Sequence, residues 1–107
     1  MGKRIKPSDA KKLCNNFDDK YKELSKFIKK DDNRSVLFSI QEIQDYIEYV
    51  KKENPTVDGL RVYLGSNKKT KMTTVFFAPT TNGKDDISLD ALNYGIAGDP
   101  KKLKYGK

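Results

Sequence analysis

The sequence predicts a small α+β domain in which a mixed or antiparallel sheet of three to four strands packs in two layers against two amphipathic helices. Three observations predict this class. Apolar residues recur at steps of three and four in two segments, which is the spacing of an amphipathic helix. Short runs rich in β-branched and aromatic residues lie between turn-forming residues. The 107 residues are enough for one domain, which we place at residues 7–100.

The first helix is expected to begin at Pro7-Ser8-Asp9, where Ser8 can cap the helix and Asp9 suits its positive end. Residues 1–6 before it are expected to form a disordered basic arm. Asp31-Asp32-Asn33 ends the helix. We expect its apolar stripe to face the core, although such a helix could also bind a partner. The stripe consists of Ala10, Leu13, Cys14, Phe17, Tyr21, Leu24, Phe27 and Ile28.

A short strand is predicted at residues 34–38, and a second helix follows it. Ser39-Ile40-Gln41-Glu42 has the pattern of a capping box, in which the Ser39 hydroxyl and the Glu42 carboxylate satisfy each other's backbone amides. Asn54-Pro55 ends this helix, because proline disfavours helical geometry in the preceding residue. If the strand at 34–38 pairs with the strand at 60–64, the helix makes a right-handed crossover.

An antiparallel hairpin is predicted next. Its first strand is Gly59–Gly65, its basic loop is Ser66–Lys71, and its second strand runs from Met72 to Ala78, ended by Pro79. Because side chains alternate along a strand, Leu60, Val62 and Leu64 share one face. The opposite face is expected to carry Arg61, Tyr63, Thr74 and Phe76.

The C-terminal part of the chain gives weaker signals. Residues 80–86 are predicted to form a polar turn, and residues 87–89 are either a short strand or the start of a helix. Gly95, Gly98 and Pro100 then prevent regular structure, and residues 101–107 are expected to form a basic tail.

The net charge of +7 comes mainly from lysine: only Arg4, Arg34 and Arg61 among the 22 basic residues are arginines. Residues 60–82 carry four basic residues and no acidic one. Lysine gives a diffuse positive field rather than the bidentate contacts that arginine makes. The charge is either an electrostatic footprint for nucleic acid or an acidic protein, or a compositional bias with a solvated surface.

The residue inventory argues against catalysis. The chain has no histidine and one cysteine, Cys14, so a zinc site, a histidine-activated nucleophile and an intramolecular disulfide are excluded. No phosphate-binding loop is present. We therefore expect no enzyme, no cofactor and no metal. A lone thiol and the lack of any long apolar run favour a cytoplasmic protein without a membrane partner, while removal of a leader peptide stays open.

Three groups of residues are candidates for partner contacts. Arg61 with Tyr63 and Phe76 has the composition of an interaction hot spot, unless the first helix covers that face. The loop lysines Lys68, Lys69 and Lys71 could contact phosphate or an acidic protein, or could be a solvated tip. Asn93 and Tyr94 form the third candidate, with anchoring of a loop as the structural alternative.

Three segments resemble a family of small uncharacterised bacterial proteins: Gly59–Gly65, Val75–Thr80 and Leu92–Gly95. The resemblance spans about residues 35–100 and implies a bacterial single-domain α+β protein, with no activity or cofactor to carry over. The expected function is a non-enzymatic protein-interaction module of the inhibitor, immunity or accessory type. Its partner is an unknown protein, for which the positive charge leaves an acidic one open, and its oligomeric state also stays open. The alternative is electrostatic binding of nucleic acid through the lysines of the first helix and the hairpin loop.

Overall fold

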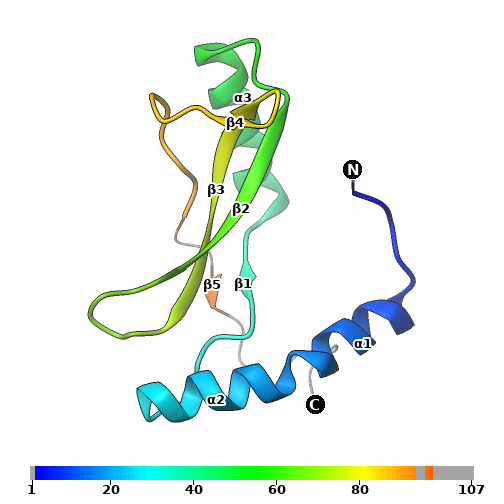
Figure 1. Cartoon of the computed structure of the whole chain (residues 1–107). Coiled ribbons are helices and arrows are strands. Elements are labelled where there is room, and N and C mark those ends of the chain that lie inside the picture. Colours follow the sequence, from blue (N-terminus) through cyan, green and yellow to red (C-terminus); the bar gives the residue numbers. More distant parts are fainter. Residues whose placement is uncertain (1, 94–95, 98–107) are drawn as a thin grey trace.

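The computed structural model describes residues 2–93 and 96–97, and within them it confirms the α+β class (Figure 1). These residues form three helices, a three-stranded antiparallel sheet in the order β2-β3-β4, and a separate pair of short strands. The elements are α1 (Pro7–Asn16), α2 (Asp18–Ile28), β1 (Val36–Leu37), α3 (Ile40–Glu53), β2 (Gly59–Ser66), β3 (Thr73–Thr81), β4 (Lys84–Asp85) and β5 (Ile96–Ala97).

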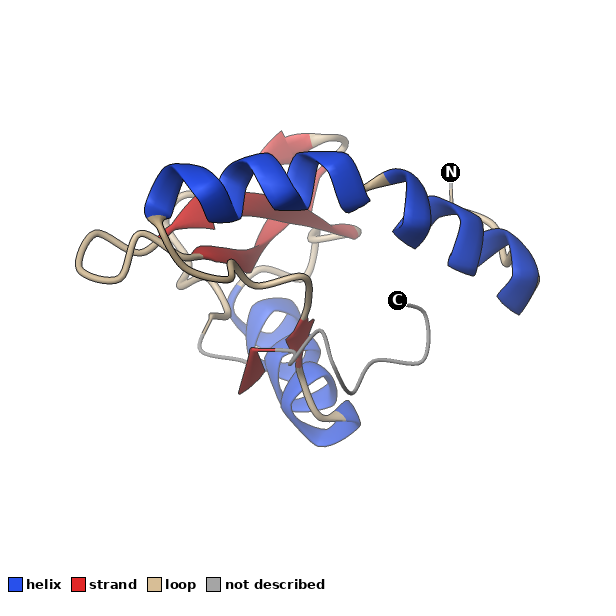
Figure 2. Cartoon of the chain, turned by 90° about the horizontal axis from the view of Figure 1, so that it is seen from below, coloured by secondary structure: helices blue, strands red, loops and turns tan. Residues whose placement is uncertain are grey.

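The expected first helix is divided in two by a kink at Phe17, which Figure 2 shows as a short break in the helical ribbon. Phe17 keeps a helical backbone, and its N–H is shared between the carbonyls of Leu13 and Cys14 at 3.2 Å each. The helix begins at Pro7 with Lys6 as its N-cap, so the expected cap at Ser8 is wrong. Proline suits this first position because its missing N–H would have had no partner there.

Part of the apolar stripe on α1 and α2 does not face a core. Tyr21 is buried and Phe17 is half-buried, but Leu13, Leu24 and Phe27 are exposed. The expectation that the whole stripe packs inward is therefore wrong. Figure 1 shows why: α1 and α2 run across one end of the hairpin, while α3 lies toward its other end.

The capping box of α3 is confirmed. The Glu42 N–H donates to Ser39 Oγ at 3.0 Å, and the Ser39 N–H donates to Glu42 Oε1 at 3.2 Å. The helix ends before Asn54, as expected. Its buried residues, Tyr46 and Val50, face the sheet and form the centre of the core with Val57. Around them pack Tyr49, Leu60, Phe77, Leu89 and Leu92.

The hairpin of β2 and β3 is confirmed, with an uninterrupted antiparallel register from Gly59 opposite Thr80 to Ser66 opposite Thr73. β3 is longer than expected, because Pro79 lies inside it opposite Leu60 and is buried. A strand tolerates proline where its nitrogen does not face a ladder acceptor. The Pro79 carbonyl still accepts a bond from the Asp86 N–H at 2.9 Å, on the side away from β2.

A second tight turn replaces the expected polar turn at residues 80–86. Asn82 and Gly83 both have positive φ, 50° and 78°, which is the geometry of a two-residue type I′ hairpin. This turn pairs β4 with the end of β3. Residues 87–89, left open between strand and helix, form neither.

The short strand β1 does not join the main sheet. Val36 pairs with Ala97 and Leu37 with Ile96, so the condition for a crossover, pairing with residues 60–64, is not met. The expected tail at 101–107 and the glycine and proline positions at 95, 98 and 100 lie outside the described residues.

Candidate interaction surface

The structure brings Arg61, Tyr63 and Phe76 together on one face of the hairpin, which we call the polar face. Tyr63 lies directly opposite Phe76 in the register, and their rings stack with centroids 5.0 Å apart and an interplanar angle of 15°. Tyr63 and Phe76 share a face, as the alternation of side chains along each strand predicted. Tyr63 is half-buried, and Arg61 remains 44% exposed in its side chain.

Asp85 of β4 organises this face. Arg61 Nη1 lies 2.6 Å from Asp85 Oδ1, Arg61 Nη2 donates to the Gly83 carbonyl at 2.8 Å, and the Tyr63 hydroxyl donates to Asp85 Oδ2. The neighbouring Tyr63 oxygen, followed by the charge of Asp85, raises the pKa of Arg61, which stays ionised. Arg61 and Tyr63 thus lean across β3 toward β4 and are held in place before any partner arrives.

A hollow of about 360 Å³ adjoins the ring stack on the polar face. Tyr63 and Phe76 form one wall, and the segment after β4 forms the other. Its lining is mainly apolar and includes the exposed side chain of Ile87. A hydrophobic anchor from another protein would fit such a hollow better than a charged substrate would.

The hairpin tip, residues 67–72, carries Lys68, Lys69 and Lys71, all exposed. Among the described residues none of the three makes an ion pair. Asn67 orders the tip by accepting bonds from the Lys69 and Thr70 amides at 2.9 and 3.0 Å. The lysine ammonium groups therefore project from a structured turn at the far end of the strands from Asp85.

The opposite, apolar face of β2 is partly uncovered. Leu60 packs into the core, but Val62 is 55% exposed and Leu64 is 79% exposed. Sequence alternation predicted that these three residues share a face, yet α3 covers only the start of the strand. The end of the strand presents bare aliphatic side chains.

Asn93 has a structural role, as the alternative interpretation expected. Its side-chain amide donates to the Val75 carbonyl at 2.6 Å and so closes part of the outer edge of β3. Its neighbour Tyr94, the other member of this candidate pair, lies outside the described residues. The structure therefore does not bring Asn93 to the polar face with Arg61 and Tyr63.

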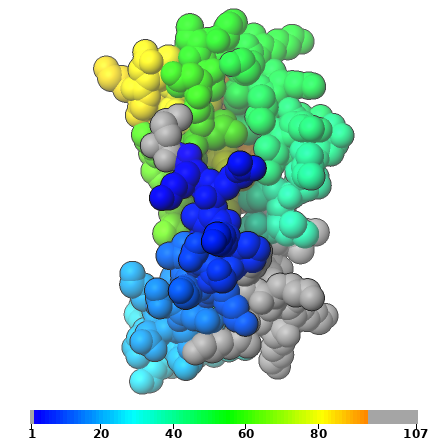
Figure 3. Space-filling model, turned by 90° about the vertical axis from the view of Figure 1, so that its right-hand side faces the viewer, coloured from blue at the N-terminus to red at the C-terminus, as the bar shows by residue number. Residues whose placement is uncertain are grey.

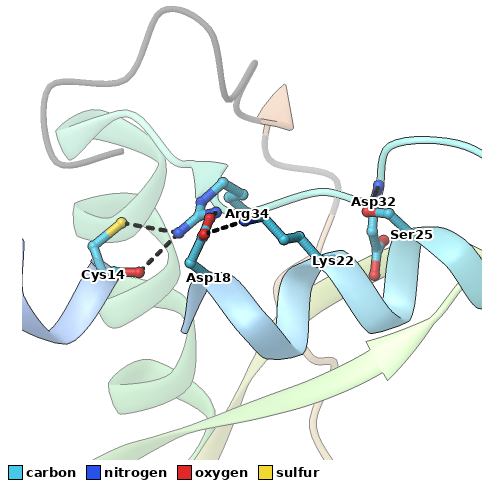
Figure 4. A network of polar contacts seen from close by, with 6 residues as sticks. All are labelled: Cys14, Asp18, Lys22, Ser25, Asp32 and Arg34. Carbon is cyan, nitrogen blue, oxygen red and sulfur yellow. Dashed lines mark hydrogen bonds and ion pairs between the residues drawn. The ribbon is translucent and has the colours of Figure 1, made fainter. Parts of the chain in front are cut away.

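A second polar cluster joins α1 and α2 to the segment before β1 (Figure 4). The Arg34 side chain is only 5% exposed. Its Nη1 lies 3.1 Å from Asp18 Oδ1, its Nη2 donates to the Cys14 carbonyl at 2.8 Å, and its guanidinium carbon lies 4.7 Å from the Tyr21 ring centroid. Burial alone would lower the pKa of Arg34, but the bonds to Cys14 and Asp18 raise it. This cluster ties the kink at Phe17 to the rest of the chain.

Asp32 is the other internal charge, with 2% of its surface exposed. Its carboxylate accepts bonds from the Thr73 amide and hydroxyl at 2.6 Å each and from the Asn33 amide at 2.8 Å. Burial raises the pKa of Asp32, but these bonds, chiefly those from Thr73, outweigh it and hold the pKa below its ordinary value. Asp32 therefore fastens the end of α2 to the start of β3.

Comparisons of the chain with protein-family models, curated proteins and solved structures gave no match. The resemblance of residues 35–100 to small bacterial proteins stays a prediction. Within residues 2–93 and 96–97, every helix is too short or too polar to span a bilayer. Across the same ranges, cysteine and carboxylate side chains do not gather in threes where a metal ion could be held.

Sequence reasoning missed Asp85, Arg34 and Asp32 as organising residues. A signal for Asp85 existed, because Asn82-Gly83 is a strong hairpin-turn dipeptide and would have placed Asp85 beside β3. Arg34 and Asp32 had no such signal. Their partners lie 16 and 41 residues away in the sequence, and only the folded chain brings them close.

Proposed function

We propose that the protein is a non-enzymatic protein-interaction module that docks a partner protein through its β2–β3 hairpin. One observation carries the proposal: Val62 and Leu64 are exposed on a regular strand, although the core of the described part of the chain has only four buried hydrophobic residues. A chain with so small a core gains by burying such side chains, and a partner protein supplies the missing cover. A cytoplasmic setting agrees with the lone thiol of Cys14.

The polar face supports the same proposal. Arg61 and Tyr63 are of the residue types enriched in binding hot spots, and Asp85 holds both in one arrangement. Side chains that are ordered before binding lose less conformational entropy when the partner arrives. The hollow beside Tyr63 and Phe76 offers room for an apolar anchor.

The test is affinity capture from native cells, with and without nuclease, using two matched variants. Leu64→Ser removes an exposed leucine from the hairpin, and Leu13→Ser removes one from α1, where the exposed fraction is 63%. We expect a protein that survives nuclease and moderate salt, and we expect Leu64→Ser to reduce its recovery by about tenfold while Leu13→Ser leaves it unchanged. The double change Arg61→Ala/Tyr63→Ala should reduce recovery as well.

Two results would overturn the proposal. If all captured material disappears with nuclease, the hairpin-tip lysines bind nucleic acid instead, and binding should then fall steeply with salt. If Leu64→Ser and Leu13→Ser recover the same protein equally well, the hairpin is not the docking surface.

A further inference from the structure

The two sides of β2 differ in their backbone hydrogen bonding. The Phe77 N–H and carbonyl both bond to Leu92, at 2.9 and 3.0 Å, so they point away from β2. Val62 is opposite Phe77, and in an antiparallel ladder both members of such a pair point their backbone groups outward. By alternation the same holds for Leu60 and Leu64. No described residue bonds to the outward groups of these three positions, which we call the free edge.

The outer edge of β3 is treated differently. At each of four alternate positions at least one outward backbone group has a partner. Thr73 bonds to Asp32 and Asn33, and Phe77 bonds to Leu92. The Val75 carbonyl accepts a bond from Asn93, and the Pro79 carbonyl accepts one from Asp86. Among the described residues, the fold thus closes one side of the hairpin with residues from three parts of the chain and leaves the other side open.

The free edge also lacks the usual protection against strand pairing. Natural edge strands carry proline, lysine or a bulge, or are very short. β2 has eight residues, no proline, no lysine and an uninterrupted register. Its one charge, Arg61, is turned toward Asp85 on the far side of β3. The strand is therefore able to accept a further strand along its length.

Side-chain room lies next to the free edge. A hollow of about 300 Å³ opens between α3 and the start of β2, lined by Ile47, Val50, Lys51 and residues 57–60. Figure 3 looks onto this side, where green residues of α3 and β2 lie above the dark blue residues 2–6. An added strand would direct alternate side chains into this hollow and over Val62 and Leu64. Those side chains must be apolar.

Charge fixes the composition of the other end of such a strand. Residues 60–82 contain no acidic residue, and the three tip lysines lie just beyond the end of β2 without an ion pair to any residue in the described part of the chain. A segment that continues along β2 past Ser66 meets these ammonium groups. Carboxylates at that end complement them, whereas a basic segment is repelled.

We propose that β2 binds an extended segment of a partner protein as an added strand, apolar at alternate positions and acidic where it passes the hairpin tip. The inference rests on the proposed function and names its mode and its class of partner. Main-chain bonds to Leu60, Val62 and Leu64 supply affinity, and the α3 hollow and the tip lysines supply selectivity. A second copy of the chain fits less well, because each copy carries a net charge of +7.

The test uses a synthetic probe on the whole protein. The probe is a labelled peptide that alternates valine and threonine and has three carboxylates at its amino end, which meets the tip in an antiparallel pairing. A second acidic probe has the reversed sequence, so that its carboxylates meet the tip in a parallel pairing. The control is a version with lysines in place of the carboxylates. Binding is measured by fluorescence polarisation, and amide hydrogen exchange is followed residue by residue by NMR.

We expect one of the two acidic probes to bind, the lysine version not to bind, and exchange at Leu60, Val62 and Leu64 to slow by at least about tenfold in the complex. Arg61 and Tyr63 amides, which face β3, should be protected with or without the probe. Val62→Pro removes an edge N–H without breaking the ladder to β3, so it should weaken binding by about tenfold, whereas the isosteric Val62→Thr keeps the N–H and should bind within about threefold.

Several outcomes overturn the inference. Binding without slowed exchange at the free edge means that the partner uses side chains alone, and the proposed function would then stand without added-strand pairing. Failure of both acidic probes removes the acidic segment as the occupant. Protection of the same three amides by self-association, seen as a dimer in light scattering without probe, assigns the edge to a second copy instead. If Val62→Pro does not fold, the exchange measurement on the unmodified protein still decides.

Discussion

Two charged residues near the end of α2, Asp32 and Arg34, hold distant parts of the chain together from within. Each is nearly excluded from water, and each has several hydrogen-bond partners. Removing one member of a buried network costs more than its net contribution, because the partners stay behind unsatisfied. The adjacent Asp31 is exposed and provides a matched comparison.

Asp32→Asn should lower the free energy of unfolding by about 1–3 kcal/mol at neutral pH, because an amide cannot accept bonds at both positions from Thr73 and Asn33. Asp31→Asn should change it by less than about 0.5 kcal/mol. Urea unfolding of the two variants measures both values. Equal losses in the two variants would show that the Asp32 carboxylate does not hold the end of α2 to the start of β3.

The pH dependence of stability follows from the same residue. The folded pKa of Asp32 is held below its ordinary value of 3.8, so the unfolded chain takes up the proton first. The stabilisation is complete above pH 3.8 and is lost as pH falls through the folded pKa. Urea unfolding at successive pH steps below that value should show a shallower acid loss in Asp32→Asn. Part of the loss should persist, because Ser88 and Asn54 also lower the pKa of Asp86.

The contributions of Arg34 and Arg61 to stability can be compared in the same way. Both pair with an aspartate, but Arg34 is buried against Tyr21 while Arg61 is partly exposed. Arg34→Lys should cost about 2 kcal/mol, since lysine cannot reach Asp18 and the Cys14 carbonyl in one planar arrangement. Arg61→Lys should cost clearly less, because an ion pair in contact with water contributes little to stability. Thermal or urea unfolding gives both losses, and an equal loss would contradict the role of Arg34.

Among the elements, the turn between β3 and β4 decides where Asp85 lies. Gly83 has a φ of 78°, and a Cβ there would meet no atom within 4 Å, so only backbone strain opposes substitution. Gly83→Ala should therefore destabilise by about 1 kcal/mol. Gly65→Ala, in β2 with ordinary contacts at 3.8 and 3.9 Å, should be neutral or slightly stabilising. Urea unfolding of the two variants tests this, and a larger loss for Gly65→Ala would refute it.

Local chemistry made α3 and the hairpin predictable from the sequence, because the capping box, the proline stop and the strand alternation involve neighbours in the chain. The kink at Phe17 and the pairing of β1 with β5 were not predictable. They depend on where Arg34 and the C-terminal strand come to lie, which local patterns do not encode. For the candidate surface, alternation placed Arg61, Tyr63 and Phe76 on one face, but not the carboxylate that holds them.

For the whole molecule, the uneven distribution of buried residues predicts uneven stability. Val50, Tyr46 and Val57 form one core between α3 and the sheet. In contrast, α1 buries no residue, and within the described residues Arg34 bonds to the Cys14 carbonyl near its end. Elements with few buried contacts open locally without global unfolding. The molecule should therefore behave as a stable body of α3 and hairpin with a loosely held helical arm.

Hydrogen exchange tests this division. Amides of α1 should exchange at least about tenfold faster than those of α3. Arg34→Lys should speed exchange in α1 and α2 further while leaving α3 unchanged, because it releases the arm without touching the core of Tyr46 and Val50. Equal exchange in α1 and α3, or equal acceleration of every element, would mean that the chain unfolds as one unit.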